Sequence, residues 1–524
     1  MGRSLACHGP HAGRGCLSVP RRAAPITIRK PLEAVRLDAE TAGMHRTLGP
    51  VQLMLIGIGC IVGAGVYVMT GTAAAEYAGP AVILSFVIAG LACGFTALCY
   101  AELSSVLPVS GASYTYAYAA LGEVTAWALA WMLMLEFGLA SAALAVGFSG
   151  YLNSLLGDFA VHIPPAILQS TLVAQTGPQG TRFVFSPSLN LIALASLAVV
   201  ALILIRGIRH SAAVNTLLVI VKVGVLLGFV VVGFGHVDTH NWTPFIPQSE
   251  GRFRYGVAGI FRAASILFFA YLGFEAVATA AAEARHPQRD IPIGILGALA
   301  ASTLLYVAVG LTMTGLVPFR ALGVPDPIAV AVEAVGAPVL SIIIKGGALT
   351  GLASVLLVNT YGHSRICFAM ATDGMLPDAF RTLHPRFATP ATGTIIIAAI
   401  AGIAAALLPI TLLADLVSIG TAFVFSVVAI STMWLRTAHP DLTRPFRVPL
   451  GGIWVRGVWI GTVPVLALLF CLTMMGPVLI DIAGKAIGGD WIPAAILGGY
   501  ILCGALLYAG YGYRHSRLAG ATTA

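Results

Sequence analysis

Charged side chains are scarce in this chain. Asp, Glu, Lys and Arg make up 10% of its 524 residues, and hydrophobic residues make up 58%. Soluble domains carry about a quarter charged residues and about half apolar ones. The composition therefore excludes an ordinary soluble domain and predicts an integral membrane protein.

The chain also lacks the motifs of the common enzymes. It has no Walker-type phosphate loop, no HExxH and no nucleophile elbow. Its eight cysteines are scattered without disulfide or metal-ligand spacing. A membrane enzyme would need a tight cluster of nucleophile, base or metal ligands, whereas the intramembrane polar residues are isolated. We expect no enzyme, no cofactor and no metal.

Long apolar runs are what the sequence does contain. Twelve stretches have the length of about 20 residues that crosses a bilayer as a helix, and their lack of period-two alternation excludes an outer-membrane barrel. The predicted fold class is an all-α membrane protein with twelve transmembrane helices. The spans are 50–71, 80–106, 124–152, 189–206, 213–235, 257–282, 293–316, 338–369, 391–409, 412–435, 457–481 and 491–513.

Lysine and arginine are distributed unequally between the loops. With the N-terminus inside, 21 of the 29 fall on the cytoplasmic side and 5 on the opposite side. The positive-inside rule then puts both termini in the cytoplasm of a multi-pass protein of the inner or plasma membrane. The net charge of +8 is read as this orientation signal, not as a nucleic-acid surface. We see no signal peptide in the basic segment 1–46, and we expect this segment to be partly disordered.

The first span contains an unusual density of glycine. The run "LMLIGIGCIVGAGVYVMTG" has Gly57, Gly59, Gly63, Gly65 and Gly71 in one helix length. Glycine lowers helix propensity by about 1 kcal/mol against alanine, so "GAG" is a plausible point of unwinding. Close helix packing is the alternative, for which Gly59 and Gly63 have the right spacing.

A second interruption is predicted in the sixth span, where "FAYLGFEA" again places a glycine midway. Because the two segments open successive five-span halves, the second half must be inverted relative to the first. Inverted repeats with discontinuous first helices indicate a midplane site in secondary transporters. The freed N–H and C=O groups of the two breaks suit the carboxylate and ammonium of a zwitterion. The predicted boundaries are 1–46, first repeat 47–236, second repeat 237–436, two further helices 437–513 and tail 514–524.

Several motifs resemble the cationic amino acid transporter family of the amino acid–polyamine–organocation superfamily. The resemblance extends from about residue 28 to about residue 515, in order. Its strongest segments are "GIGCIVGAGVYVMTGTAAAEYAGPA", "CYAELSSVLPVSGASYTYAYAALGE", "LEFGLASAALAVGFSGYL", "FFAYLGFEAVATAAAEARHPQRDIPIGI" and "RICFAMATDGMLP". It implies ten helices in a 5+5 inverted-repeat core like that of bacterial leucine transporters, with two more at the C-terminus. It also implies a proton-coupled amino acid importer working by alternating access.

The resemblance also implies a substrate site at the two breaks. Backbone around Ile61 to Gly65 and Phe269 to Leu272 would meet the main-chain groups of the substrate. The substrate-binding residues expected on this basis are Ile61, Gly63, Ala64, Gly65, Glu136, Phe269, Ala270 and Leu272.

Lys222 stands alone in the apolar run "LLVIVKVGVLLGF". A lysine at a helix centre costs about 2.5–3.5 kcal/mol on insertion scales, so it should face the bundle or a cavity. From the residues alone, pairing with a buried carboxylate and gain and loss of a proton remain open. The resemblance implies the second role, with the amine against carbonyls beside the first break.

Three glutamates and one arginine need interpretation. We expect Glu136 to serve the pocket in preference to pairing with Lys222, and Glu275 to serve gating or proton relay with Lys222. Glu102 is read as a partner of loop backbone or a local arginine. Arg262 would either snorkel outward or place positive charge near the entrance and disfavour cationic substrates.

We therefore expect a membrane-embedded, proton-coupled amino acid importer. The alternative is an exchanger of amino acids or polyamines without net proton coupling. The expected partners are the amino acid substrate, protons and the lipid bilayer, with no nucleic acid. The sequence leaves open which amino acid is carried, and whether a small accessory membrane subunit or a homo-oligomer forms.

Overall fold

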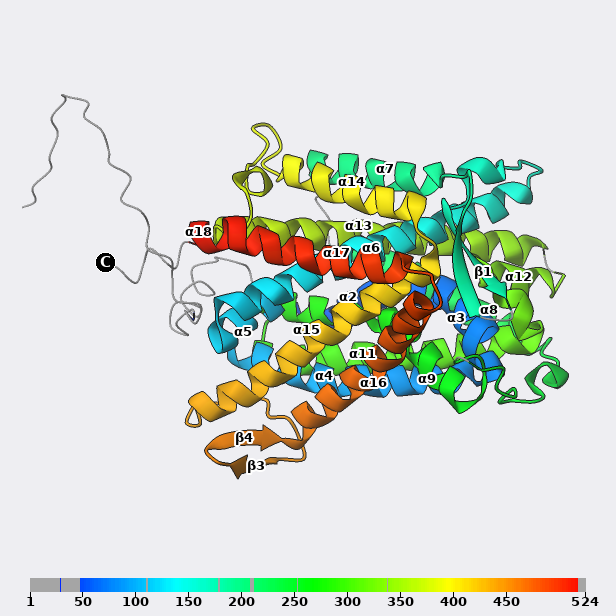
Figure 1. Ribbon diagram of the computed structural model, residues 1–524. Helices are drawn as coiled ribbons and strands as arrows, with labels where there is room; N and C mark the ends of the chain where they lie inside the picture. The colour runs from blue at the N-terminus through cyan, green and yellow to red at the C-terminus, as the bar shows by residue number, and fades with distance from the viewer. Residues whose placement is uncertain are drawn as a thin grey trace, which may run out of the picture.

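The computed structural model describes residues 29, 48–109, 112–177, 180–207, 212–251, 253–336 and 338–516. Apart from Arg29, the predicted N-terminal segment 1–46 lies outside these residues, as does most of the predicted tail 514–524. The described chain forms a bundle of helices with two small β-hairpins (Figure 1).

Helices lie at the first five predicted spans. The first starts at Pro50, where a proline at the first helical position costs no backbone hydrogen bond, and Gln52 accepts the Gly49 N–H at 2.7 Å. The elements of this half are α2 (Pro50–Ile61), η1 (Gly65–Met69), α3 (Thr70–Ala73), η2 (Ala74–Ala78), η3 (Gly79–Ala81), α4 (Val82–Val106), α5 (Ala112–Leu121), α6 (Glu123–Gly157), η4 (Pro165–Ile167), β1 (Leu172–Gly177), β2 (Gly180–Phe185), α7 (Leu191–Arg206) and α8 (Ala212–Phe234).

The remaining seven predicted spans are also helical. Their elements, with the connecting segments, are η5 (Thr239–Trp242), α9 (Gly256–Leu267), η6 (Phe268–Tyr271), α10 (Glu275–Thr279), η7 (Ala280–Glu283), α11 (Pro287–Leu316), η8 (Phe319–Leu322), α12 (Pro327–Glu333), α13 (Pro338–Thr372), η9 (Asp378–Phe380), α14 (Ala391–Leu407), α15 (Ile410–Ala438), β3 (Gly452–Val455), β4 (Val458–Gly461), α16 (Thr462–Ile487), α17 (Ile492–Leu507), η10 (Tyr508–Gly512) and α18 (Tyr513–His515).

Nine helical segments in the described ranges are long and apolar enough to cross a membrane. The other three predicted spans contain the shorter apolar helices α2, α7 and α14. The helical, multi-span character predicted from the sequence is confirmed. The count of twelve crossings and the inverted repeat remain predictions.

One prediction of local structure needs correction. The span 457–481 begins later than predicted, because Val458–Gly461 pairs with Gly452–Val455 in an antiparallel hairpin before α16 starts at Thr462. The segment between the second and third predicted spans contains a further helix, α5. A second hairpin, β1 with β2, lies between α6 and α7, where Leu172 pairs with Phe185.

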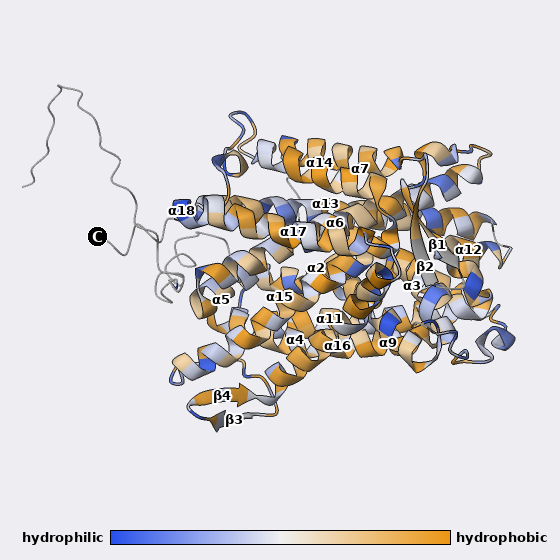
Figure 2. Cartoon of the chain, viewed as in Figure 1, coloured by the Kyte–Doolittle hydropathy of each residue, from blue (hydrophilic) through white to orange (hydrophobic). Residues whose placement is uncertain are grey.

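Hydrophobic residues predominate along the helices of the bundle (Figure 2). The outer face of α8, for example, exposes Leu217, Ile220 and Val231. Apolar residues exposed along a helix are what a lipid environment requires. One large cluster of buried apolar residues links most of the helices into a single core.

Small residues allow the first helix to approach α11 closely. A side chain at Gly57 would meet the Cβ of Ala298 at 2.6 Å, and one at Gly294 would meet the Cβ of Leu53 at 2.8 Å. The packing interpretation of the glycine-rich run therefore applies to Gly57. The unwinding interpretation applies further along, at Gly63.

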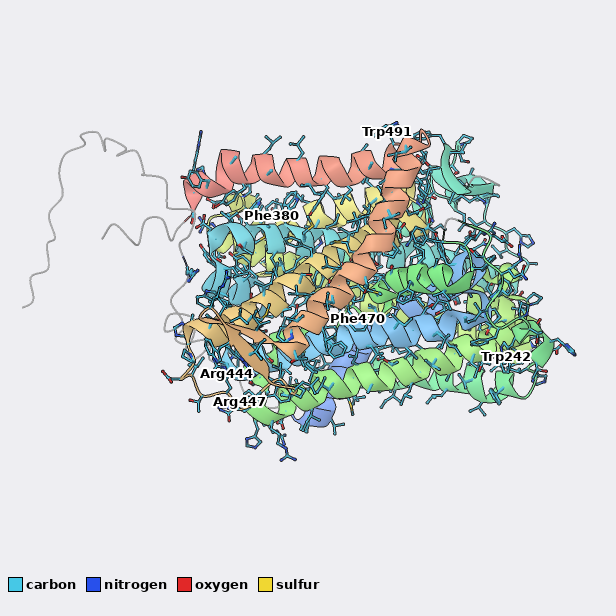
Figure 3. The ribbon with its side chains drawn as sticks, turned by 60° about the horizontal axis from the view of Figure 1, so that its bottom comes forward. Trp242, Phe380, Arg444, Arg447, Phe470 and Trp491 are labelled. Atoms are coloured by element: carbon cyan, nitrogen blue, oxygen red, sulfur yellow. The ribbon has the colours of Figure 1, made fainter. Side chains whose placement is uncertain are left out.

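The two ends of the bundle carry different residues. Figure 3 shows Arg444 and Arg447 beside the β3–β4 hairpin and Trp242 at the opposite end. Helix α5 and the C-terminal α18 lie at the same end as the hairpin (Figure 1). We refer to this end as the α5 end and to the other as the Trp242 end.

Candidate functional site

The first transmembrane segment is interrupted at the predicted place. Helix α2 ends at Ile61, and Val62 adopts an extended conformation with φ −73° and ψ 93°. The chain resumes as a π-helix from Gly65 to Met69. Gly65 is required here, because a Cβ at this position would overlap the backbone and side chain of Ala270.

The sixth predicted span is interrupted as well, as the sequence predicts. After α9 ends at Leu267, the chain passes through the short 3-10 helix η6. Leu272 is extended, with ψ 134°, and Gly273 has a φ of +118°, which favours glycine. Helix α10 then starts at Glu275, whose carboxylate accepts the Gly273 N–H at 3.0 Å.

One buried tyrosine joins the two interruptions. The Tyr306 hydroxyl on α11 lies 2.7 Å from the Ile61 carbonyl oxygen and 3.0 Å from that of Ala270. A single hydroxyl thus contacts carbonyls that neither interrupted helix can satisfy internally. Tyr306 was not predicted from the sequence, although it is the one tyrosine in the apolar span 293–316, a signal that could have found it.

Lys222 on α8 is buried against the first interruption. Its Nζ donates to the carbonyl oxygen of Gly59 and, at 3.0 Å, to that of Val62. The same side chain therefore satisfies carbonyls released where α2 ends. Lys222 does not pair with Glu136, so the alternative of an internal pair between these two residues is wrong.

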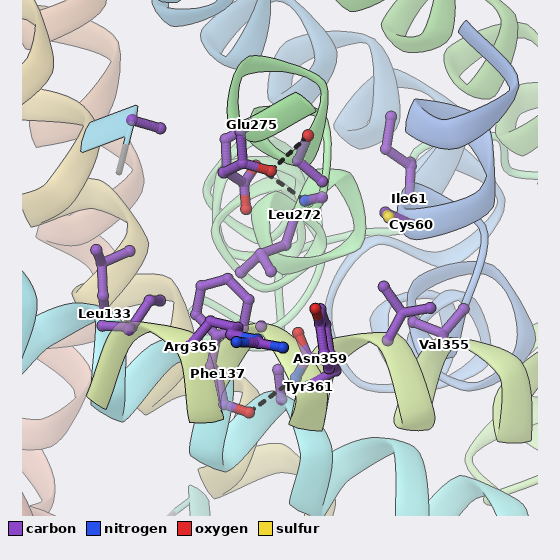
Figure 4. Close-up of a pocket in the computed structure, with 18 of the residues that line it drawn as sticks. Cys60, Ile61, Leu133, Phe137, Leu272, Glu275, Val355, Asn359, Tyr361 and Arg365 are labelled. Atoms are coloured by element: carbon purple, nitrogen blue, oxygen red, sulfur yellow. Dashed lines mark hydrogen bonds between the residues drawn. The ribbon is translucent and has the colours of Figure 1, made fainter. Parts of the chain in front are cut away.

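A cavity of about 710 Å³ lies beside both interruptions (Figure 4). Of the predicted substrate-binding residues, six line it, and so does the predicted coupling residue Glu275. These lining residues are Ile61, Gly63, Ala64, Gly65, Phe269, Leu272 and Glu275.

Ala270, Glu136 and Lys222 are not among the lining residues. Ala270 is buried against Gly65, which places it between the two interrupted segments. The Glu136 side chain is fully buried, near Gly420 of α15, and neither of its oxygens has a hydrogen-bond partner among the described residues. The prediction that Glu136 faces the pocket is therefore not met in this conformation.

The wall opposite the second interruption comes from α6 and α13. Figure 4 shows Leu133, Phe137 and Val355 across the cavity from Leu272 and Glu275. Asn359 donates its amide to the Phe137 carbonyl at 2.8 Å and to Ser141 at 2.9 Å. These two bonds fix the orientation of its side chain. The wall is mostly apolar and was not predicted, because it combines residues more than 200 positions apart.

The cavity extends toward the α5 end. Its lining there includes Ser113 and Tyr114 of α5, Glu283, and Arg365 of α13. Glu283 and Arg365 are exposed. The Arg365 guanidinium lies 4.9 Å from the ring centre of Tyr361. An amphipathic solute at the interruptions thus has a polar route to this end.

Glu102 and Arg262 do not line the cavity. Glu102 accepts from Arg436 at 2.7 and 2.5 Å and from the Val448 N–H at 2.8 Å, which confirms its interpretation as a partner of arginine and loop backbone. Arg262 is fully buried and lies 2.8 Å from Asp415. The expectation that Arg262 snorkels outward is therefore wrong. The effect of its charge on cationic substrates stays a prediction.

No group of three or more metal-ligating side chains occurs among the described residues. Within the same ranges the cysteines are free thiols. The polar groups at the interruptions are mainly backbone carbonyls and N–H groups. Such an arrangement can bind a zwitterion, and it offers no activated nucleophile.

Comparison with known proteins identifies transporters as relatives of this chain. The family model described as amino acid permease matches residues 48–502. The chain is 39% identical over 490 residues to the methylthioribose transporter of Bacillus subtilis, which covers 94% of this chain and 98% of the relative. It is 38% identical over 486 residues to a branched-chain amino acid permease of the same organism, covering 92% and 97%.

A plant relative supports the resemblance to cationic amino acid transporters. The chain is 40% identical over 341 residues to the chloroplastic cationic amino acid transporter 9 of Arabidopsis thaliana, covering 65% of this chain and 58% of the relative. These relatives are named as transporters or permeases, not as enzymes. The chain belongs to the amino acid permease family of the amino acid–polyamine–organocation superfamily.

Proposed function

We propose that this protein is a proton-coupled amino acid importer that works by alternating access. The observation that carries the proposal is the meeting of two interrupted helices at one cavity, with the Lys222 amine against carbonyls at the first interruption. The substrate carboxylate would take N–H groups at Gly63 to Gly65, and its ammonium would take carbonyls near Phe269. Twelve crossings, a 5+5 inverted repeat and cytoplasmic termini belong to the same proposal.

Coupling follows from what Lys222 contacts. A protonated amine holds α8 to the end of α2 by charge-assisted hydrogen bonds, whereas a neutral amine holds it more weakly. Protonation from outside and release inside would then alternate the strength of this contact. Glu275, which lines the cavity two residues after Gly273, is a second candidate for the proton path.

The cavity favours a neutral substrate with an apolar side chain. The apolar part of its lining includes Leu133, Phe137, Leu144, Val355 and Val358. Glu136, which could attract a cationic side chain, does not line the cavity. Among the relatives, the branched-chain amino acid permease has a name that agrees with this preference. The relative named for methylthioribose adds that compound to the substrates worth testing.

The test is uptake of radiolabelled leucine, alanine, arginine and methylthioribose into proteoliposomes, with and without an inward proton gradient. We expect gradient-driven accumulation of leucine. Uptake that ignores the gradient but requires amino acid preloaded inside would establish the exchanger instead. Failure of every label to enter would refute the proposal.

Lys222 variants test the coupling. Lys222→Met removes the donor and should abolish accumulation. Lys222→Arg keeps a donor but cannot lose its proton, so it should retain leucine binding and lose gradient-driven accumulation. If Lys222→Arg accumulates leucine as well as the parent does, Lys222 is a structural tie and not the coupling group.

A further inference from the structure

A largely buried cluster of four charged residues joins α9 to its neighbours near the Trp242 end. The Arg262 Nη2 atom lies 2.8 Å from Asp415 on α15 and 3.4 Å from Asp481 on α16. Lys485 lies 2.9 Å from Asp481, so the cluster holds two cations and two anions. We call Arg262, Asp415, Asp481 and Lys485 the outer cluster. The Tyr77 ring of η2 lies 4.9 Å from the Arg262 guanidinium.

The outer cluster is a poor device for stability alone. Taking ions out of water costs several kcal/mol each, and apolar residues of similar volume often stabilise a protein as well as a buried ion pair does. Arg262 Nε, Arg262 Nη1 and Asp415 Oδ1 also have no hydrogen-bond partner among the described residues. A half-satisfied cluster of this kind fits a contact that forms in one conformation and opens to water in another.

The structure is closed on the side of the outer cluster. Val66, Met69, Ala263 and Leu267, which lie in the halves of the interrupted segments nearest the cluster, have no exposure. Toward the α5 end, by contrast, Thr279 and Glu283 of the second interrupted segment are exposed, and both line the cavity. The cavity is therefore reached from the α5 end.

Arg262 lies on a helix that an interruption separates from the rest of its segment. Helix α9 is separated from α10 by the interruption at residues 268–274, which includes Gly273 at φ +118°. Asp415 and Asp481 belong to α15 and α16, which run unbroken past this region. Separation of α9 from these two helices would open a path from the Trp242 end to the cavity.

On the basis of the transport function proposed above, we propose that the outer cluster is the tie that closes the external entrance. Arg262 is the positioning residue of this tie. It holds α9 against α15 and α16 while the cavity faces the cytoplasm. Separation of Arg262 from Asp415 and Asp481 accompanies opening to the outside.

The cavity contains its own reporter, because Cys60 lines it. A background chain with Cys7, Cys16 and Cys503 replaced by serine leaves Cys60 and four buried cysteines, which are Cys93, Cys99, Cys367 and Cys471. In reconstituted vesicles of known orientation, a membrane-impermeant maleimide is added to one face at a time. In the background chain, we expect Cys60 to react mainly from the face that carries the α5 end.

Arg262→Met should shift the protein toward the outward-facing state. We expect the rate of external labelling of Cys60 to rise roughly tenfold, with a fall in labelling from the α5 face. Arg262→Lys keeps one charge but lacks the fork that reaches two carboxylates, and it should give an intermediate rise. If Arg262→Met does not fold, the external labelling rate of Cys60 in Arg262→Lys tests the proposal.

The matched control is Arg320→Met. Arg320 also pairs with a carboxylate, Glu250, at 2.7 Å, but its side chain is 61% exposed and it lies outside the outer cluster. The Arg320→Met substitution should leave the external and the internal labelling rates of Cys60 unchanged. An unchanged ratio of external to internal labelling in both Arg262 variants would overturn the proposal, as would equal labelling of the background chain from both faces.

The labelling does not depend on transport. Unchanged labelling in variants that still accumulate leucine would therefore refute the outer tie alone. Absence of uptake in the background chain would instead count against the transport function itself.

Discussion

At the scale of single residues, the site depends on how closely the two interrupted helices approach. Gly65 and Ala270 are in contact because glycine has no side chain. Tyr306 then bridges the carbonyls of Ile61 and Ala270. The backbone groups that would recognise a substrate are thus held in place by contacts that leave no room for another methyl group.

Gly65→Ala tests this close approach. The added methyl would overlap Ala270, so η1 and η6 must separate and the backbone groups at the interruptions must shift. We expect substrate binding, measured as leucine-dependent thermal stabilisation of the purified protein, to be lost. The matched control is Gly224→Ala on α8, where nothing lies within 4 Å of the added methyl. Leucine binding that survives Gly65→Ala would show that the site lies elsewhere.

At the scale of elements, the sequence predicts where a helix is interrupted better than it predicts which residues meet across the fold. Glycine density and the carboxylate after "FAYLG" located both helix breaks, because a break is a local property of the backbone. The apolar run around Lys222 indicated a buried lysine, because this signal too is local in the sequence. The hairpins and α5 were missed, since short polar segments between long apolar spans carry little periodic signal.

Long-range contacts could not be predicted in the same way. Arg262 meets Asp415 across 153 residues of sequence, and nothing in the local pattern identifies that partner. The face of α6 that lines the cavity includes Leu133 and Phe137 but not Glu136. The rotation of a helix that is apolar all round is set by its neighbours and not by its own sequence.

Glu102 joins three elements at the α5 end, and its removal should destabilise that end. Its carboxylate is almost fully buried and binds Arg436 of α15 and the Val448 N–H before the β3–β4 hairpin. Breaking a buried pair costs about 3–5 kcal/mol, because an uncompensated charge remains. We expect Glu102→Gln to lower the thermal unfolding midpoint of the purified protein markedly.

The control for Glu102→Gln is Asp378→Asn, which removes an ion pair with Arg381 whose side chains are 70% and 36% exposed. A pair of this kind contributes about 0–1 kcal/mol, so the midpoint should hardly change. Equal effects of the two substitutions would mean that the Glu102 contacts add no more than a surface pair does.

At the scale of the whole molecule, the orientation of the protein in the membrane decides which side the cavity faces. The cavity is reached from the α5 end, and the proposed import cycle assigns that end to the cytoplasm. The assignment rests on the excess of arginine and lysine predicted for one side, which includes Arg444 and Arg447 near the β3–β4 hairpin (Figure 3). If the orientation were reversed, the same structure would be outward-facing and the outer cluster would close the inner entrance.

Two exposed threonines provide a matched test of this orientation. Thr239, in η5 near Trp242, and Thr443, between α15 and the β3–β4 hairpin, lie at opposite ends of the bundle. In intact cells expressing a cysteine-free background, an impermeant maleimide should label Thr239→Cys at once and Thr443→Cys only after the membrane is permeabilised. Labelling in the reverse order would mean that the protein has the opposite orientation in the membrane. It would make the cavity an external one, and import would then have to begin from the conformation described above.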